Sequence, residues 1–277
     1  MKLSIITINR NNAEGLCRTM ESVLAQTYRD FEYIIVDGAS TDGSVDVIQE
    51  CESANRLSAH PVTLTWVSEP DKGIYDAMNK GIEIASGDYL YFLNGGDTLY
   101  EQNTLSRMIA AIDGSDFIVG RVDSLLNGNS LGLSAVLTES DYTLYQMYLR
   151  GISHQSVLIK RSVQEQYPYD TSFRLCADWK FFVQTVVLRN ATVKNTDVVY
   201  ARFDRSGVSS AGRDVVEERL RIVETTLPKR LASDYLHVLP HYYEVVRIEW
   251  LLNHPFFYRV YRGWTTLGRK LFGKKAR

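Results

Sequence analysis

Acidic and amide side chains follow several short apolar runs in the first hundred residues of the chain. Asp37 follows the run FEYIIV, and the segment Asn94-Gly95-Gly96-Asp97 follows YLYFL. Carboxylates gathered at one place repel one another unless a cation joins them. If the ligand carries phosphates, Mg²⁺ or Mn²⁺ suits such a place, because these ions take one or two protein carboxylates and complete their shell with phosphate oxygens and water.

Each of these residues also has a purely structural interpretation. The segment ending in Asp97 can be a strand-ending turn in which the two glycines allow a close backbone approach, and Asp37 can cap a helix or shape a turn. Their occurrence at the ends of neighbouring predicted strands favours a ligand site over two unrelated turns.

Alternating strand and helix patterns must position these side chains. Four short runs rich in β-branched and aromatic residues predict strands over Leu3–Ile8, Phe31–Val36, Val62–Val67 and Tyr89–Leu93. Apolar residues at helical spacing separate them, so we expect parallel β-α-β units in an α/β domain. Ligands of such sheets bind outside the carboxyl ends of the strands. Residues expected at that edge are Thr7, Asn9, Arg10, Asp37, Glu69, Asp71, Lys72, Asn94 and Asp97.

The rest of the chain is more mixed. Asn127-Gly128 between extended segments predicts a hairpin turn, and Asp178–Leu188 predicts a buried helix. From about Gly207 the pattern is helical only. We therefore expect a catalytic or binding domain over residues 1–206 and a helical extension over residues 207–277.

Composition narrows the class of protein. The chain has 277 residues, 45% hydrophobic and 23% charged, as in ordinary globular domains. The start of the chain has no apolar run long enough for a signal peptide core, no stretch approaches a membrane span, and three separated cysteines predict neither disulfides nor a metal knuckle. We expect a reduced, cytoplasmic protein, while its oligomeric state stays open.

Charge is uneven along the chain. Residues 1–100 carry 15 acidic and 7 basic side chains, whereas residues 201–277 carry 8 acidic and 15 basic ones. The acidic first part argues against a nucleic acid held by its phosphates. The basic last part needs a separate explanation.

Four segments in order resemble glycosyltransferase family 2, a family of GT-A fold enzymes. They are SIITINRNN, YIIVDGASTDGS, SEPDKGIYDAMNKGIEIASGDYLYFLNGGD and CADW, and the resemblance spans roughly residues 1–205. The run EPDKGIYDAMNKG is similar to bacterial enzymes that build surface polysaccharides such as colanic acid and O-antigen. The resemblance implies a mainly parallel central sheet flanked by helices, here with a C-terminal helical extension.

Site roles follow from the resemblance position by position. It implies that Asp37 hydrogen-bonds the uracil of a UDP-sugar, and that Thr7 to Asn9 lie against the nucleoside. It implies that Asp97 binds Mn²⁺ or Mg²⁺ and that Asp178 is the general base. The implied activity is an inverting transfer of a sugar from a nucleotide sugar to a hydroxyl of a glycan or lipid-linked acceptor.

Two positions depart from the family pattern. Asn94 stands where the family's metal motif usually begins with aspartate, and Ala177 stands where glutamate usually precedes the base. The thinner metal motif keeps open a nucleotide- or carbohydrate-binding protein that has lost catalysis. Another nucleotide-using α/β enzyme, such as a dehydrogenase or a nucleotidyltransferase, is a further alternative. The dehydrogenase is disfavoured, because Asn9–Gly15 contains no Gly-x-Gly-x-x-Gly turn for a pyrophosphate.

Three further residues are secondary candidates. Lys72 precedes a predicted helix and could offset diphosphate charge or could be an ordinary loop lysine. His154 could contact the acceptor or the diphosphate, or could be structural. Trp179, beside Asp178, could stack on a sugar or belong to the core.

The basic end of the chain has an amphipathic pattern. From Pro255 to Arg277 there is no acidic residue. Apolar positions from Phe257 to Leu271 share one side of a helix, and Arg259 and Arg262 fall on the other. This pattern is typical of a helix in a membrane interface, which would place the protein peripherally on the inner face of the cell membrane. A helix packed on the catalytic domain or on a second subunit would show it too.

Overall fold

The structure, a computed structural model, describes residues 2–149, 151–204, 213–238 and 241–272. These residues form two compact units, Met1–Arg219 and Leu220–Arg277. The predicted boundary between residues 206 and 207 lies outside the described residues. The first unit contains the sheet and the second is helical.

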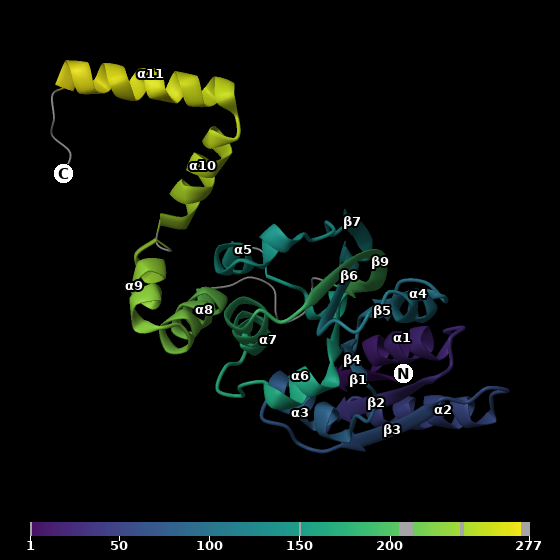
Figure 1. The fold of residues 1–277 in the computed structure, drawn as a ribbon. Helices are drawn as coiled ribbons and strands as arrows, with labels where there is room; N and C mark the ends of the chain where they lie inside the picture. Colours follow the sequence, from purple (N-terminus) through teal and green to yellow (C-terminus); the bar gives the residue numbers. More distant parts are fainter. Residues whose placement is uncertain (1, 150, 205–212, 239–240, 273–277) are drawn as a thin grey trace. The chain divides into compact units, whose positions relative to one another are not determined.

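The described strands form one mixed sheet in the order β3-β2-β1-β4-β8-β6-β9-β5, with β7 paired to β6 (Figure 1). Their bounds are β1 Leu3–Asn9, β2 Phe31–Asp37, β3 Thr63–Ser68, β4 Tyr89–Phe92, β5 Thr98–Leu99, β6 Phe117–Leu126, β7 Asn129–Leu133, β8 Val157–Lys160 and β9 Val193–Asp204. The first four strands in this order are parallel, as the β-α-β pattern predicts. Strand β8 then runs antiparallel to both β4 and β6.

Strand register brings the expected edge residues side by side. Asn9 pairs with Asp37 at the carboxyl ends of β1 and β2, and Asp37 pairs with Ser68 at the end of β3. All residues of β1 and β2 are buried, which explains why both strands read as continuous apolar runs.

Helices cover both faces of the sheet (Figure 1). One face packs against α1, α2 and α4, whose residues Leu16, Met20, Ile48 and Leu105 join the main core cluster. The other face packs against α3, α6 and α7. The helices of the first unit are α1 Ala13–Leu24, α2 Ser44–Leu57, α3 Ile74–Ile84, α4 Thr104–Ala110, α5 Leu144–Leu149, α6 Arg161–Gln166 and α7 Ala177–Phe182, with the 3₁₀ turns η1 Glu139–Tyr142 and η2 His154–Ser156.

Two local predictions from the sequence are confirmed. Asn127 and Gly128 both have positive φ and connect β6 to β7 as a two-residue hairpin, the backbone that an Asn-Gly pair favours. The predicted helix over Asp178–Leu188 is α7 followed by the π-helical segment η3, Val183–Val187.

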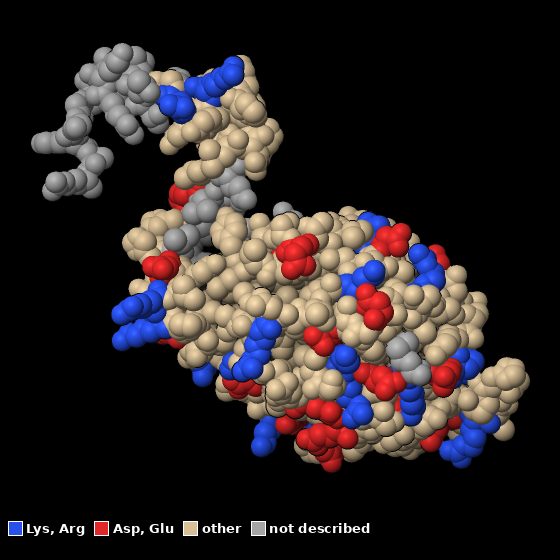
Figure 2. Space-filling model, in the orientation of Figure 1, with Lys and Arg blue, Asp and Glu red and all other residues tan. Residues whose placement is uncertain are grey.

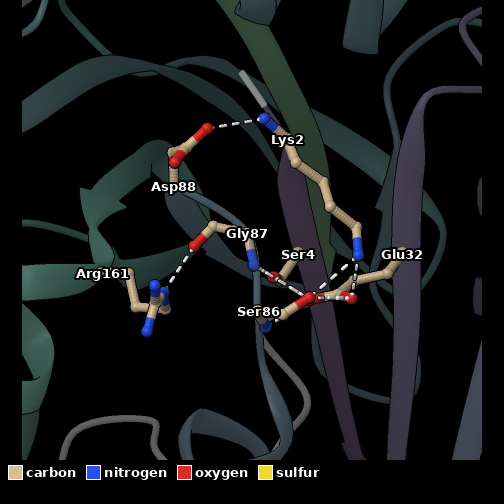
Figure 3. A network of polar contacts seen from close by, with 7 residues as sticks. All are labelled: Lys2, Ser4, Glu32, Ser86, Gly87, Asp88 and Arg161. Atoms are coloured by element: carbon tan, nitrogen blue, oxygen red, sulfur yellow. Dashed lines mark hydrogen bonds and ion pairs between the residues drawn. The ribbon is translucent and has the colours of Figure 1, made fainter.

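A buried glutamate ties together the amino ends of β1 and β2 (Figure 3). The Glu32 carboxylate accepts hydrogen bonds from Lys2 Nζ, Ser4 Oγ, and the backbone amides of Ser86 and Gly87, at 2.5 to 3.1 Å. Burial raises the pKa of Glu32, but these hydrogen bonds outweigh burial and lower it to about 2. This network stabilises the sheet at the edge opposite Asp37.

The second unit consists of helices in its described residues. Helix α8, Arg213–Thr226, crosses from the first unit into the second, and α9 Lys229–Val238, α10 Tyr242–Leu252 and α11 Pro255–Phe272 follow. No helix in the described parts of the chain is both long enough and apolar enough to span a bilayer.

Candidate active site

Asp37 and Asn9 form a closed hydrogen-bond cluster at the ends of β1 and β2. Asp37 Oδ1 accepts from Asn9 Nδ2 at 3.0 Å and from Ser40 Oγ at 2.5 Å, and Oδ2 accepts from the Ser40 amide at 2.9 Å and Ser68 Oγ at 2.7 Å. Burial raises the pKa of Asp37, but the bonds from Ser40, Ser68 and Asn9 outweigh burial and lower it. These four bonds occupy the acceptor capacity of an ionised carboxylate.

Asp71 reaches the same edge from the loop after β3. A Cβ added at Gly38 would lie 2.1 Å from Asp71 Oδ2, so the Asp71 carboxylate packs directly on the Gly38 backbone. Arg10 Nη1 lies 3.7 Å from Asp71 Oδ1. The first β-α loop, the end of β2 and the loop after β3 therefore meet around Asp71.

Two other predicted nucleotide residues differ in exposure. Thr7 is fully buried, and its hydroxyl donates to the Leu93 carbonyl at 2.7 Å with the Tyr33 hydroxyl 3.0 Å away. Through these contacts the Thr7 hydroxyl joins β1 to β2 and to the end of β4, which is a structural role. Lys72 is exposed, and its backbone amide donates to Asp76 at the start of α3.

Asp97 lies beyond the turn that ends β4. Gly96 in this turn has φ of +110°, and the Thr19 hydroxyl donates to the Asp97 carbonyl at 2.7 Å. The Asp97 side chain is buried, and its Oδ2 accepts from Gln155 Nε2 at 3.0 Å. Gln155 thus orients the carboxylate for which the family resemblance implies a metal-binding role.

The residues of this turn fit a divalent cation that arrives with phosphates. The described residues contain no group of three or more His, Cys, Asp or Glu side chains able to hold a metal by themselves. They do place the Asp97 carboxylate three residues after Asn94, whose buried Oδ1 finds no hydrogen-bond donor in the described parts of the chain. Carboxylate and amide oxygens are ligands that Mg²⁺ and Mn²⁺ accept, with phosphates and water filling the rest.

Asp178 lies in the first turn of α7 with three hydrogen-bond donors around its carboxylate. Oδ1 accepts from the Tyr75 hydroxyl at 2.8 Å and from the Trp179 amide at 2.8 Å, and Oδ2 lies 3.3 Å from His154 Nδ1. Its side chain is 20% exposed. Burial raises the pKa of Asp178, but the bonds from His154 and Tyr75 and the attraction of the imidazole outweigh burial and lower it. The carboxylate is therefore ionised and partly open to a ligand.

His154 connects Asp178 to the end of β4. Its Nε2 lies 2.9 Å from Asn94 Nδ2. Because an amide nitrogen only donates, Nε2 accepts this bond, while Nδ1 faces Asp178 Oδ2. One imidazole thus joins the expected diphosphate edge to the expected base.

Trp179 does not line this site. It is 4% exposed, its indole nitrogen donates to the Met147 carbonyl at 2.7 Å, and its ring packs edge-on against Tyr148. The alternative that Trp179 belongs to the core therefore fits the structure, and we do not include it among ligand contacts.

Two residues that sequence reasoning did not assign complete the cluster. Tyr75 carries no predicted role, yet its hydroxyl bonds Asp178 across 103 positions. Gln155 carries none either, yet its side chain bonds Asp97. No local sequence pattern marks Tyr75, because its contact with Asp178 forms only in the folded chain.

Comparison with known proteins decides the family. Residues 4–151 match the sequence model of "Glycosyl transferase family 2". The chain belongs to this family. A PGL/p-HBAD biosynthesis glycosyltransferase of Mycobacterium tuberculosis is 32% identical over 210 residues, which cover 74% of this chain and 77% of the relative. An uncharacterized glycosyltransferase of the same species is 34% identical over 217 residues, which cover 75% of this chain and 77% of the relative.

Solved structures agree with the fold of this family 2 glycosyltransferase. The crystal structure of S. aureus TarS 1-349 in complex with UDP-GlcNAc has a TM-score of 0.63 at 18% identity, covering 85% of this chain and 72% of TarS 1-349. Mannosyltransferase PcManGT from Pyrobaculum calidifontis, in complex with GDP-Man and Mn²⁺, has a TM-score of 0.58 at 16% identity, covering 96% and 80%. The expected GT-A fold is confirmed.

Proposed function

We propose that this glycosyltransferase moves a sugar from a nucleoside-diphosphate donor, with UDP favoured, to a hydroxyl of a glycan or lipid-linked saccharide, with inversion at the anomeric carbon. The observation that carries the proposal is the environment of Asp178. An ionised, partly exposed carboxylate is held by Tyr75 and His154, and His154 also bonds Asn94 at the expected diphosphate edge.

Asp178 acts as the general base in this proposal. The acceptor hydroxyl gives its proton to the carboxylate while its oxygen bonds the anomeric carbon, and the bond from that carbon to the diphosphate oxygen breaks. Attack from the face opposite the leaving group inverts the centre. A carboxylate with a lowered pKa remains ready to accept a proton at neutral pH, and proton transfer late in the reaction tolerates its weak basicity.

The donor occupies the edge formed by β1 to β4. We propose that Asn9, Asp37, Asp71 and Lys72 serve the nucleotide and that Asn94 faces the diphosphate. Protein donors fill the acceptor positions of the Asp37 carboxylate. Asp37 therefore contacts a nucleobase only if the Ser40 or Ser68 hydroxyl rotates away, and otherwise it orients these two serines for that contact. Asn9 Oδ1 is buried without a donor in the described part of the chain, so it is available to a nucleotide N–H group.

Asp97, with Asn94, would hold Mn²⁺ or Mg²⁺ in this proposal. A bound cation supplies charge that stabilises the departing diphosphate. Gln155 orients the Asp97 carboxylate for that role. One structural neighbour is in complex with UDP-GlcNAc and another with GDP-Man and Mn²⁺, which supports a nucleotide sugar and a divalent metal for this chain.

A donor panel tests the function. The full chain is incubated with UDP-, GDP- and dTDP-sugars, with and without Mn²⁺, and nucleotide release is measured. We expect metal-dependent release from at least one UDP-sugar, and proton NMR of the product should show the anomeric configuration opposite to that of the donor. Metal-dependent binding of UDP without any release would favour the alternative of a binding protein. Retained configuration would overturn the inverting mechanism.

A further inference from the structure

The junction of α10 and α11 exposes an unusual number of large apolar side chains. Trp250, Phe256, Phe257 and Tyr261 are 48 to 72% exposed. Ile248, Leu252 and Val260 are also 46 to 55% exposed. We call these seven residues the aromatic corner. Exposed apolar residues this concentrated mark an interaction surface, whereas scattered ones need no explanation.

The aromatic corner has a defined local structure. Helix α10 ends at Leu252 and α11 begins at Pro255, a residue that suits the first position of a helix. His254 Nδ1 donates to the Trp250 carbonyl at 2.7 Å, and the two rings stack with centroids 4.2 Å apart. Phe257 lies 5.2 Å from the Trp250 ring and 5.4 Å from Phe256. The aromatic rings are thus held as one surface rather than dispersed.

Positive charge accompanies this surface. Residues 255–277 contain seven Arg and Lys and no Asp or Glu. Figure 2 shows blue side chains among tan ones over the described beginning of α11. The Arg262 guanidinium lies 5.9 Å from the Tyr258 ring centroid. Arg259 and Arg262 stand on the α11 turns that also carry Phe257, Val260 and Tyr261.

We propose that the aromatic corner and the basic α11 dock on a bilayer surface that contains anionic lipids. Trp, Tyr and Phe enter the headgroup and acyl boundary, while Arg and Lys pair with lipid phosphates. Charge complementarity selects a lipid surface over a symmetric contact between two copies of this segment, since residues 255–277 carry only positive charge and cannot complement themselves. The inference stands apart from the proposed chemistry, because it uses none of the residues around Asp178.

Vesicle sedimentation tests the proposal. The full chain is mixed with phosphatidylcholine vesicles, with or without roughly 30% phosphatidylglycerol, at low and at high salt. The variant F256S/F257S removes apolar surface, and R259Q/R262Q removes charge. L57S is the matched control, because Leu57 is 88% exposed on α2 of the first unit.

We expect sedimentation only with the anionic vesicles, and weaker sedimentation at high salt. R259Q/R262Q should lower the partition coefficient about 25-fold, since each surface cation contributes about fivefold. F256S/F257S should abolish sedimentation, and L57S should leave it unchanged. Nucleotide release with a water-soluble acceptor should be equal in all variants, which separates this test from that of the proposed function.

Three results would overturn the proposal. The first is a full chain that ignores anionic vesicles. The second is sedimentation that both double variants retain. The third is a dimer, seen by size exclusion without lipid, that F256S/F257S dissociates while vesicles bind neither protein; the corner would then be a contact between copies.

Discussion

His154 Nδ1 lies 3.3 Å from Asp178 Oδ2, although 24 residues separate the two in sequence. The contact forms because η2 leads into β8, which pairs with β4, while Asp178 lies in the first turn of α7. Through this contact the imidazole orients the Asp178 carboxylate and favours its ionised form.

Replacing His154 should change the pH dependence of turnover. In His154→Leu the hydrogen bond is lost while burial of Asp178 remains, so the pKa of Asp178 rises and the acidic limb of the kcat profile moves to higher pH. Because the carboxylate also loses the imidazole that orients it, we expect kcat at neutral pH to fall about tenfold. His154→Asn, which keeps an amide donor near the Nδ1 position, should restore part of the loss. An unchanged pH profile in His154→Leu would contradict this role.

Tyr75→Phe should weaken the base more mildly. The change removes the hydroxyl that lies between the Asp178 carboxylate and the Leu175 carbonyl. We therefore expect kcat to fall several-fold and the free energy of unfolding to fall by about 1 kcal/mol. Urea unfolding and kcat are measured for both this variant and Tyr89→Phe. Tyr89 is buried and donates to the Ser115 carbonyl away from the site, so Tyr89→Phe should lose similar stability and keep its kcat. Equal kcat in the two variants would argue against a role for the Tyr75 hydroxyl.

Gln155→Met should raise the Mn²⁺ concentration needed for half-maximal activity by about tenfold or more, because an outer residue that orients a metal-bound carboxylate contributes that much to metal affinity. Activity should recover at high Mn²⁺. Gln164→Met is the matched control, since Gln164 is fully buried and donates to the Tyr167 carbonyl. Chelation by EDTA should abolish turnover in every variant. Turnover that survives EDTA would remove the metal from the account.

Glu32→Gln should destabilise the chain in a pH-dependent way. The pKa of Glu32 is about 2 in the folded state and ordinary in the unfolded state, so the unfolded state binds more protons between these values. The stabilisation, on the order of 3 kcal/mol, is present above the ordinary carboxyl pKa and is lost as pH falls towards 2. Urea unfolding should show a smaller difference in the free energy of unfolding between Glu32→Gln and the unmodified chain at pH 3.5 than at pH 7. Glu83 is exposed, so Glu83→Gln should have the same free energy of unfolding as the unmodified chain at both pH values.

Sequence patterns predicted the parallel half of the sheet and its polar edge well. Runs such as Leu3–Ile8 have one dominant explanation, and parallel pairing forces their ends together. The pairing of Asp178 with Tyr75 could not be predicted, because it depends on how α3 and α7 pack, which no local pattern encodes. Trp179 illustrates the converse: its position beside Asp178 in sequence suggested a ligand contact, but successive helical residues point about 100° apart, and the indole lies in the core.

The turnover of Asp178→Asn tests the central claim most directly. The substitution keeps the size of the side chain and removes the proton acceptor, so donor affinity measured by calorimetry should stay within about twofold while kcat falls about a thousandfold. Asp170→Asn, which breaks a partly buried ion pair with Lys180, is the control and should keep its kcat. An Asp178→Asn enzyme that releases nucleotide and transfers sugar at nearly the unmodified rate would contradict the assignment of Asp178 as the base.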